Sequence, residues 1–157
     1  MKNDLNATIL LVEDNDDDVF AMRRSLDIGK VTNPLQVVTD GKQAKDYLSG
    51  TGIYAEREKF PLPFLIFLDL KLPYFTGFEI LEWMRTQPQL ESIVVVVVTG
   101  SAENRDQDTA YRLGARSYLV KPPKAETLNT IFNSLTSIWL SKPLGTPASF
   151  DAGRTTN

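Results

Sequence analysis

The sequence predicts one α/β domain built on a doubly wound, five-stranded parallel sheet. Short apolar runs alternate with helix-like segments about five times along the chain, which is the rhythm of βαβ units. Turn residues bound each run, as expected of strands buried on both faces. The chain has 157 residues, of which 42% are hydrophobic, and this suffices for a single domain with its own core.

The predicted strands are the apolar runs at residues 8–12, 35–39, 64–68, 93–98 and 117–120. Valine, isoleucine, leucine and phenylalanine dominate these runs and suit a buried sheet. Parallel neighbours are joined by right-handed crossovers, which helices usually fill.

The predicted helices lie at residues 16–28, 41–48, 78–87 and 104–113, with a last one from about 124 to 140. Asp16, Asp17 and Asp18 offer caps for the first helix, and Gly29 ends it. The last helix has apolar residues at helical spacing between Leu128 and Trp139, so we expect it to pack on the sheet.

Two segments carry no such pattern. Residues 51–63 contain Gly52, a charged patch and two prolines, which predicts an extended, surface-exposed connection. From residue 141 the composition shifts to Ser, Pro, Gly and Thr. We therefore expect a domain at 1–140 and a disordered tail at 141–157.

Composition excludes several kinds of site. The chain has no cysteine and no histidine, so disulfides, thiolate zinc sites and histidine chemistry within this chain are excluded. The net charge is −3 and no basic cluster stands out, so nothing indicates nucleic-acid binding. The first eight residues are polar and no apolar stretch is long enough for a membrane span, so we expect a cytoplasmic protein.

Four apolar runs end in residues that can take part in phosphate chemistry. Glu13 and Asp14 follow the first run, Asp69 the third, Thr99 the fourth and Lys121 the fifth. In an open parallel sheet, ligands bind beyond the carboxyl ends of the strands. The fold should therefore gather three carboxylates, a hydroxyl and an ammonium, a set that suits a divalent cation, an aspartyl nucleophile and a phosphoryl group.

The acidic residues each have a simpler structural explanation as well. Asp69 can attack phosphorus or merely cap the next loop. Asp14 and Asp69 can ligate Mg²⁺ directly, with Glu13 acting through water, or the acidic run can favour a helix N-terminus. Three carboxylates at one edge would repel each other without a cation, so we favour metal binding.

The other residues at this edge are less specific. Lys121 can neutralise a phosphoryl group or be an ordinary exposed lysine, and a cis bond to Pro122 would fix its direction. Thr99 can donate its hydroxyl to phosphate or simply fill a strand position. Tyr118 lies three residues before Lys121, hence on the opposite side of the strand, where a packing role is the simpler explanation.

Several short motifs follow in a fixed order along residues 8–140. They are Leu11-Val12-Glu13-Asp14-Asn15, Asp69-Leu70-Lys71-Leu72-Pro73 with Gly77, Val98-Thr99-Gly100-Ser101, Gly114-Ala115 and Tyr118-Leu119-Val120-Lys121-Pro122. The ordered set resembles the response-regulator receiver domain of two-component signalling. The resemblance implies a flavodoxin-like receiver fold with strand order 2-1-3-4-5 and five flanking helices.

The same resemblance implies the roles of the acidic residues. Asp69 becomes the phosphoacceptor, and Glu13 and Asp14 become the acidic pocket. The backbone carbonyl of Lys71 becomes a ligand of the Mg²⁺ cofactor. The protein is then no enzyme in the usual sense, but a phosphoacceptor that assists its own phosphorylation and slow dephosphorylation.

The resemblance also implies a conformational switch. Thr99 and Tyr118 become the switch pair, with Tyr118 turning inward on phosphorylation, and Lys121 becomes the phosphate-binding lysine. Gly100 stands where Ser or Ala is usual, which loosens the backbone beside the switch. The start of the motif set and the long segment before residue 64 resemble the small stand-alone regulators of phytochrome-type histidine kinases.

The expected partner is a sensor histidine kinase that donates its phosphoryl group to Asp69. We also expect a homodimer through the face formed by the fourth helix, the fifth strand and the fifth helix, where Trp139 lies late on the last helix.

Two alternatives stay open. The first is a Mg²⁺-dependent aspartate-nucleophile phosphatase. Such enzymes typically place an acidic residue two positions after the nucleophile, and here that position is Lys71. The second is a degenerate receiver that only binds partner proteins, against which Asp69, Thr99 and Lys121 argue.

Overall fold

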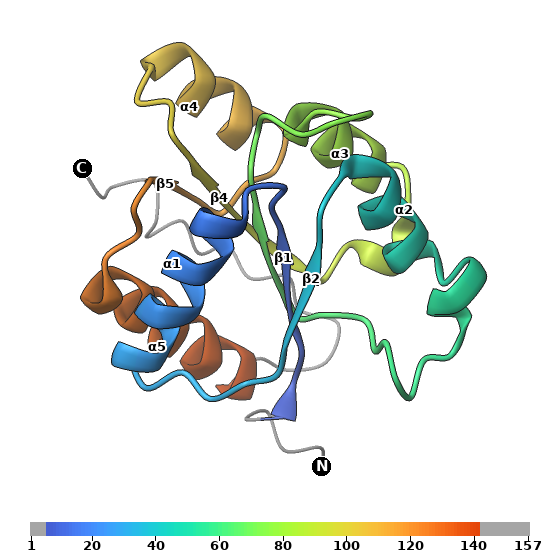
Figure 1. Cartoon of the computed structure of the whole chain (residues 1–157), viewed down its shortest axis with the longest axis horizontal. Coiled ribbons are helices and arrows are strands. Elements are labelled where there is room, and N and C mark those ends of the chain that lie inside the picture. Colours follow the sequence, from blue (N-terminus) through green and yellow to red (C-terminus); the bar gives the residue numbers. More distant parts are fainter. Residues whose placement is uncertain (1–5, 142–157) are drawn as a thin grey trace.

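The computed structural model describes residues 6–141, with side chains to residue 135, as a parallel sheet between two layers of helices (Figure 1). The strands are β1 (Ile9–Val12), β2 (Leu35–Val38), β3 (Leu65–Leu68), β4 (Val94–Thr99) and β5 (Ser117–Val120). The α-helices are α1 (Asp16–Ile28), α2 (Gly41–Ser49), α3 (Gly77–Met84), α4 (Asn104–Arg112) and α5 (Ala125–Ser141). The strand order is β2-β1-β3-β4-β5 with every pair parallel, which confirms the predicted fold.

Some predictions fall outside the described part of the chain. Of the tail predicted for residues 141–157, only Ser141 is described, and it ends α5. The side chain of Trp139 is likewise outside it. Within residues 6–141, no helix combines the length and the apolar character that a membrane crossing requires.

The cap of α1 and the end of α3 differ from the sequence prediction. The N-cap of α1 is Asn15, whose Oδ1 accepts a hydrogen bond from the Asp18 amide at 3.0 Å, so the prediction of an aspartate cap was wrong. The aspartates form the first helical turn instead. Helix α3 ends at Met84 rather than at residue 87. The Thr86 and Gln87 amides donate to carbonyls only three residues back, and Gln87, before Pro88, is extended.

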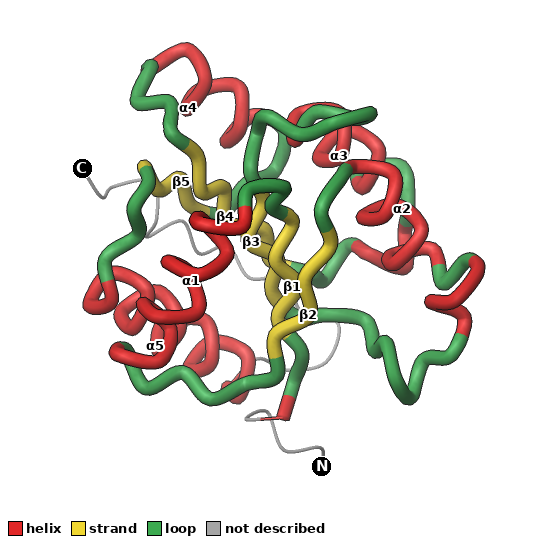
Figure 2. Tube along the Cα trace, viewed as in Figure 1, coloured by secondary structure: helices red, strands yellow, loops and turns green. Residues whose placement is uncertain are grey.

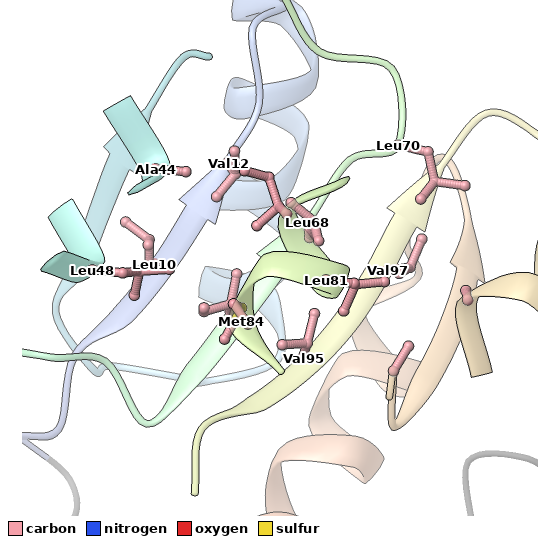
Figure 3. Packing of buried hydrophobic residues seen from close by; sticks show 14 of the residues in the cluster. Leu10, Val12, Ala44, Leu48, Leu68, Leu70, Leu81, Met84, Val95 and Val97 are labelled. Carbon is pink, nitrogen blue, oxygen red and sulfur yellow. The ribbon is translucent and has the colours of Figure 1, made fainter. Parts of the chain in front are cut away.

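The sheet separates two hydrophobic clusters. On one face, Leu10, Val12 and Leu68 pack against Leu48 of α2 and Leu81 of α3 (Figure 3). The other face packs against α1 and α5, which lie together on one side of the tube in Figure 2, away from α2 and α3. Its members include Ile9, Leu11, Met22, Leu26, Leu128 and Phe132. Successive strand residues point to opposite faces, so a strand can contribute side chains to both clusters.

The segment 51–63 is not the extended connection that the sequence predicts. Residues Gly52–Ala55 form a 3-10 helix (η2), and Arg57 turns back onto the end of α2. Its guanidinium donates to the carbonyl oxygens of Tyr47 at 2.7 Å, Leu48 at 3.0 Å and Phe60 at 3.1 Å. A planar guanidinium with five donors can satisfy several helix-end carbonyls at once, so this segment is a folded cap on α2.

Two glycines fix the loop between β3 and α3. A Cβ on Gly77 would lie 2.4 Å from the carbonyl oxygen of Asp69, and one on Gly41 would lie 2.5 Å from that of Phe75. The Gly41 amide donates to Pro73 at 3.1 Å and the Gly77 amide to Leu70 at 2.9 Å. The loop after β3 is therefore held main chain to main chain at both ends.

Candidate functional site

Strand register brings the predicted acidic residues together. Val12 of β1 lies opposite Leu68 of β3, so Glu13 and Asp69, which follow them, leave the sheet side by side. Carboxylate oxygens of Glu13, Asp14 and Asp69 lie within 4.8 Å of one another, with Asp14 exposed and the other two buried. Hard oxygen donors at this spacing fit a divalent cation such as Mg²⁺.

Lys121 reaches into this cluster from the end of β5. Its Nζ lies 2.8 Å from Glu13 Oε1, 3.0 Å from Asp69 Oδ2 and 2.7 Å from Asp18 Oδ2. The side chains of Glu13, Asp69 and Lys121 are all less than a fifth exposed. A buried carboxylate is costly unless it is paired, and Lys121 supplies the pairing here.

This arrangement shifts the pKa values of Glu13 and Lys121. Burial raises the pKa of Glu13 to about 7, with help from the Asp69 charge and against the opposing effect of Lys121. For Lys121, burial lowers the pKa, but hydrogen bonds to Asp18, Glu13 and Asp69 outweigh it and raise the pKa above its usual value. Lys121 is therefore an ammonium at neutral pH.

The backbone orients the Asp69 carboxylate. Oδ1 accepts a hydrogen bond from the Leu70 amide at 2.7 Å, and the Lys71 amide lies 3.5 Å from the same oxygen. Oδ2 faces Lys121. Oδ1 is thus held by the main chain, while Oδ2 lies against the ammonium of lysine, a residue type with a flexible side chain.

The Thr99 end of the site is connected to β5 through Ser101. Thr99 is buried, and the Ser101 amide lies 3.5 Å from its Oγ1. The Tyr118 hydroxyl donates to the Ser101 carbonyl at 2.8 Å, while Ser101 Oγ donates to Asp106 of α4 at 2.7 Å. Tyr118 is 8% exposed and belongs, with Ala110 of α4, to the hydrophobic cluster that packs against α2 and α3. Its turn inward on phosphorylation stays a prediction.

Sequence reasoning missed two contacts of this site. The sequence predicts a role for Asp18 only at the start of the first helix, as a cap or through the helix dipole, yet Asp18 binds Lys121 across 103 residues of sequence. Ser101 was named only as part of a motif, and no feature of the sequence shows that its carbonyl accepts from Tyr118. Glu13, Asp14, Asp69 and Lys121 do come together as predicted, with Thr99 at the end of the adjoining β4.

The fold and this acidic edge define a class of protein. Residues 9–133 match the family model of the response regulator receiver domain. The chain therefore belongs to the response regulator receiver family.

Two relatives match most of the chain. The chain is 35% identical over 132 residues to the probable methanogenesis regulatory protein FilR2 of Methanothrix harundinacea, covering 84% of this chain and 83% of the relative. It is also 35% identical over 132 residues to the response regulator Rcp1 of Synechocystis sp., covering 84% and 88% of the two chains.

Solved structures give the same picture. The phosphorylated cyanobacterial phytochrome response regulator RcpA aligns with a TM-score of 0.70 at 33% identity, over 88% of this chain and 96% of that one. The Mn²⁺-bound form of Rcp1 aligns with a TM-score of 0.68 at 34% identity, over 90% and 99%. The chain is thus similar to phytochrome response regulators in both sequence and fold.

Proposed function

We propose that this protein is a phosphoacceptor response regulator that takes a phosphoryl group from a sensor histidine kinase onto Asp69. The observation that carries the proposal is the setting of the Asp69 carboxylate, which is buried, held by the Leu70 amide and paired with Lys121 beside Glu13 and Asp14. We assign this function to residues 1–140, the range expected from the sequence.

In the proposed transfer, a carboxylate oxygen of Asp69 attacks the phosphorus of a phosphohistidine. A new O–P bond forms, the P–N bond breaks, and its electron pair goes to the imidazole nitrogen. A carboxylate nucleophile has no proton to lose as it attacks, so the step needs no general base. The protein contributes positioning and charge neutralisation, which dominate phosphoryl transfer. This accords with a chain that has no histidine.

Glu13, Asp14 and Asp69 would hold the divalent cation, together with the backbone carbonyl of Lys71. A cation bound there neutralises negative charge on the phosphoryl oxygens. That a relative was crystallised with Mn²⁺ supports this proposal. We expect Mg²⁺ to serve in this protein, because it prefers carboxylate and carbonyl oxygen ligands.

The negative charge of the phosphoryl group would change the positions of Lys121, Thr99 and Tyr118. The ammonium of Lys121 lies 3.0 Å from Asp69 and can move to the phosphoryl oxygens. Thr99 would turn its hydroxyl toward them, and the loop containing Ser101 would follow, with Tyr118 fixing its new position through the Ser101 carbonyl. Phosphorylation would thus shift the population of conformations on the α4, β5 and α5 face.

Two partners follow from this proposal. The kinase would be of the phytochrome type, as the names of several similar solved structures suggest. The α4, β5 and α5 face would pair two copies of the chain, and Val120 of β5 is 41% exposed there. Light scattering with and without beryllofluoride tests the pairing, and a monomeric mass in both conditions would contradict it.

The variant Asp69→Asn tests the central assignment. Incubated with acetyl phosphate and Mg²⁺, wild type should gain one acid-labile phosphate by mass spectrometry and Asp69→Asn none. The matched control is Asp108→Asn, an exposed aspartate of α4, which should behave as wild type. Stoichiometric phosphate on another residue of Asp69→Asn would overturn the assignment.

A further inference from the structure

Asp18 is the nearest of the three carboxylates that surround Lys121. Its Oδ2 lies 2.7 Å from Nζ, against 2.8 Å for Glu13 and 3.0 Å for Asp69. An ammonium has three donors and no acceptor, so these contacts use all of them. Asp18 differs from the other two because it comes from helix α1 rather than from a strand end.

Helix α1 holds the whole Lys121 segment, not only the ammonium. Two turns after Asp18, Ser25 Oγ donates to the Pro123 carbonyl at 2.9 Å. Between them, Met22 lines a cavity of about 20 Å³ that Pro122 and Pro123 also line. That volume suits one water. Asp18 and Lys121 also line this cavity, so α1 and the segment after β5 meet along one continuous contact.

The phosphorylated site would compete for two of the three carboxylates. Glu13 and Asp69 belong to the acidic edge that fits a cation, and Asp69 would carry the phosphoryl group. Their contacts with Lys121 must then weaken, which frees two donors for phosphoryl oxygens. Asp18 is not among the grouped carboxylates of Glu13, Asp14 and Asp69, so its contact can persist.

We propose that Asp18 is a positioning residue that keeps the Lys121 ammonium directed at the phosphoryl group through a lasting ion pair from helix α1. This inference rests on the proposed phosphoacceptor function. Without Asp18, Lys121 would keep its charge but lose its anchor on the α1 side. A charge-assisted hydrogen bond of this kind is worth about tenfold or more in binding.

The test compares Asp18→Ala with Asp17→Ala, its neighbour in the same helical turn. Asp17 is exposed and carries the same charge toward the helix N-terminus, so it controls for the helix dipole. Calorimetry measures affinity for Mg²⁺ alone and for beryllofluoride in saturating Mg²⁺. We expect Asp18→Ala to bind beryllofluoride about tenfold more weakly with unchanged Mg²⁺ affinity, and Asp17→Ala to match wild type in both.

A second measurement does not depend on phosphate. The ¹⁵N signal of the Lys121 ammonium should be observable in wild type because the group is shielded and paired, and should broaden or vanish in Asp18→Ala. Asp18→Asn keeps an acceptor oxygen and should restore part of the signal and of the beryllofluoride affinity. If Asp18 had only a structural role, Asp18→Asn would restore the ammonium signal and the beryllofluoride affinity only together with the free energy of unfolding.

The outcomes separate this inference from the proposed function. If wild type takes up no phosphate from acetyl phosphate, the phosphoacceptor proposal itself fails. A second outcome is that wild type is phosphorylated and Asp18→Ala binds beryllofluoride as well as or better than wild type. Asp18 would then not help Lys121 to bind the phosphoryl group, and the positioning role would be overturned. Equal losses in Mg²⁺ and beryllofluoride affinity would overturn it too, because they would place Asp18 at the cation.

Discussion

The Tyr118 hydroxyl and the Ser101 carbonyl are joined by a 2.8 Å hydrogen bond that ties β5 to the loop after β4. Burial raises the pKa of Tyr118, so the phenol stays protonated and able to donate at neutral pH. Ser101 lies two residues after Thr99, and its Oγ donates a second hydrogen bond to Asp106 of α4, so these two bonds together link the candidate site to both β5 and α4.

The first prediction removes that bond. Tyr118→Phe should lower the free energy of unfolding by about 1 kcal/mol, because it deletes one hydrogen bond from a buried phenol. Urea unfolding followed by circular dichroism measures this. Tyr74→Phe makes the same chemical change at a side chain that is 77% exposed, and it should change stability by less than about 0.5 kcal/mol. Equal effects in the two variants would contradict the prediction.

The second prediction concerns Gly100 and Gly114. A Cβ would meet open space at either glycine, but only Gly114 has a left-handed backbone, with φ +113°. Gly100→Ala should therefore stabilise the fold by about 0.5 kcal/mol through the unfolded chain. Gly114→Ala should destabilise it by about 1 to 2 kcal/mol through backbone strain. Thermal unfolding measures both changes in stability. If both substitutions changed the stability in the same direction, the prediction would be wrong.

The third prediction separates the two acidic residues after β1. Asp14→Ala should weaken Mg²⁺ binding more than Glu13→Ala, because we expect direct ligation by Asp14 and water-mediated contact by Glu13. Isothermal titration calorimetry at fixed pH gives both affinities. Asp16→Ala, an exposed change in the same acidic run, serves as control. Wild-type Mg²⁺ affinity in Asp14→Ala would refute direct ligation.

The fourth prediction addresses the cap on α2. Arg57→Lys keeps the charge but cannot reach the carbonyls of Tyr47, Leu48 and Phe60 together, so it should cost about 2 kcal/mol of unfolding free energy. Arg105→Lys is the matched control, since that side chain is 85% exposed in a 3.6 Å ion pair. Equal stability of the two variants in urea would mean that the guanidinium geometry is not needed.

The fifth prediction is a pH dependence. Burial raises the pKa of Tyr47 to about 12 in the folded state, against 10 for a free phenol. Folding therefore favours the neutral form, and this contribution is complete below pH 10 and is lost as the pH rises toward 12. It amounts to about 3 kcal/mol.

The Tyr47→Phe variant isolates this contribution. It should be less stable than wild type at pH 7, because it loses the 2.8 Å bond to the Pro61 carbonyl, and the gap should close between pH 10 and 12. Guanidinium unfolding at several pH values follows the gap. A gap independent of pH would show that Tyr47 does not titrate as its burial requires.

The sequence allowed the fold to be predicted because its signals are local. Apolar runs, turn residues and strand-end polar residues each occupy a few adjacent positions, and Glu13, Asp69 and Lys121 follow strands whose register the parallel sheet imposes. The match to known motifs then supplied the strand order.

What could not be predicted depends on contacts between distant residues. Asp18 and Asp17 look alike in the sequence, and only the packing of α1 against the segment after β5 decides which one meets Lys121. Arg57 lies in a patch of mixed charge that is typical of a solvated loop, yet its position near the end of α2 makes it a cap. Long side chains at loop positions can reach several backbone groups, and sequence spacing does not specify which.

The contact between Gly77 and Asp69 makes the start of α3 and the end of β3 a single stiff joint. No side chain lies between the Gly77 Cα and the Asp69 carbonyl oxygen to be trimmed or reoriented. A shift of the main chain at Asp69 must therefore be passed to α3 rather than absorbed by a rotamer change. For protein engineering, position 77 is a site where no second substitution elsewhere can make room for a larger residue.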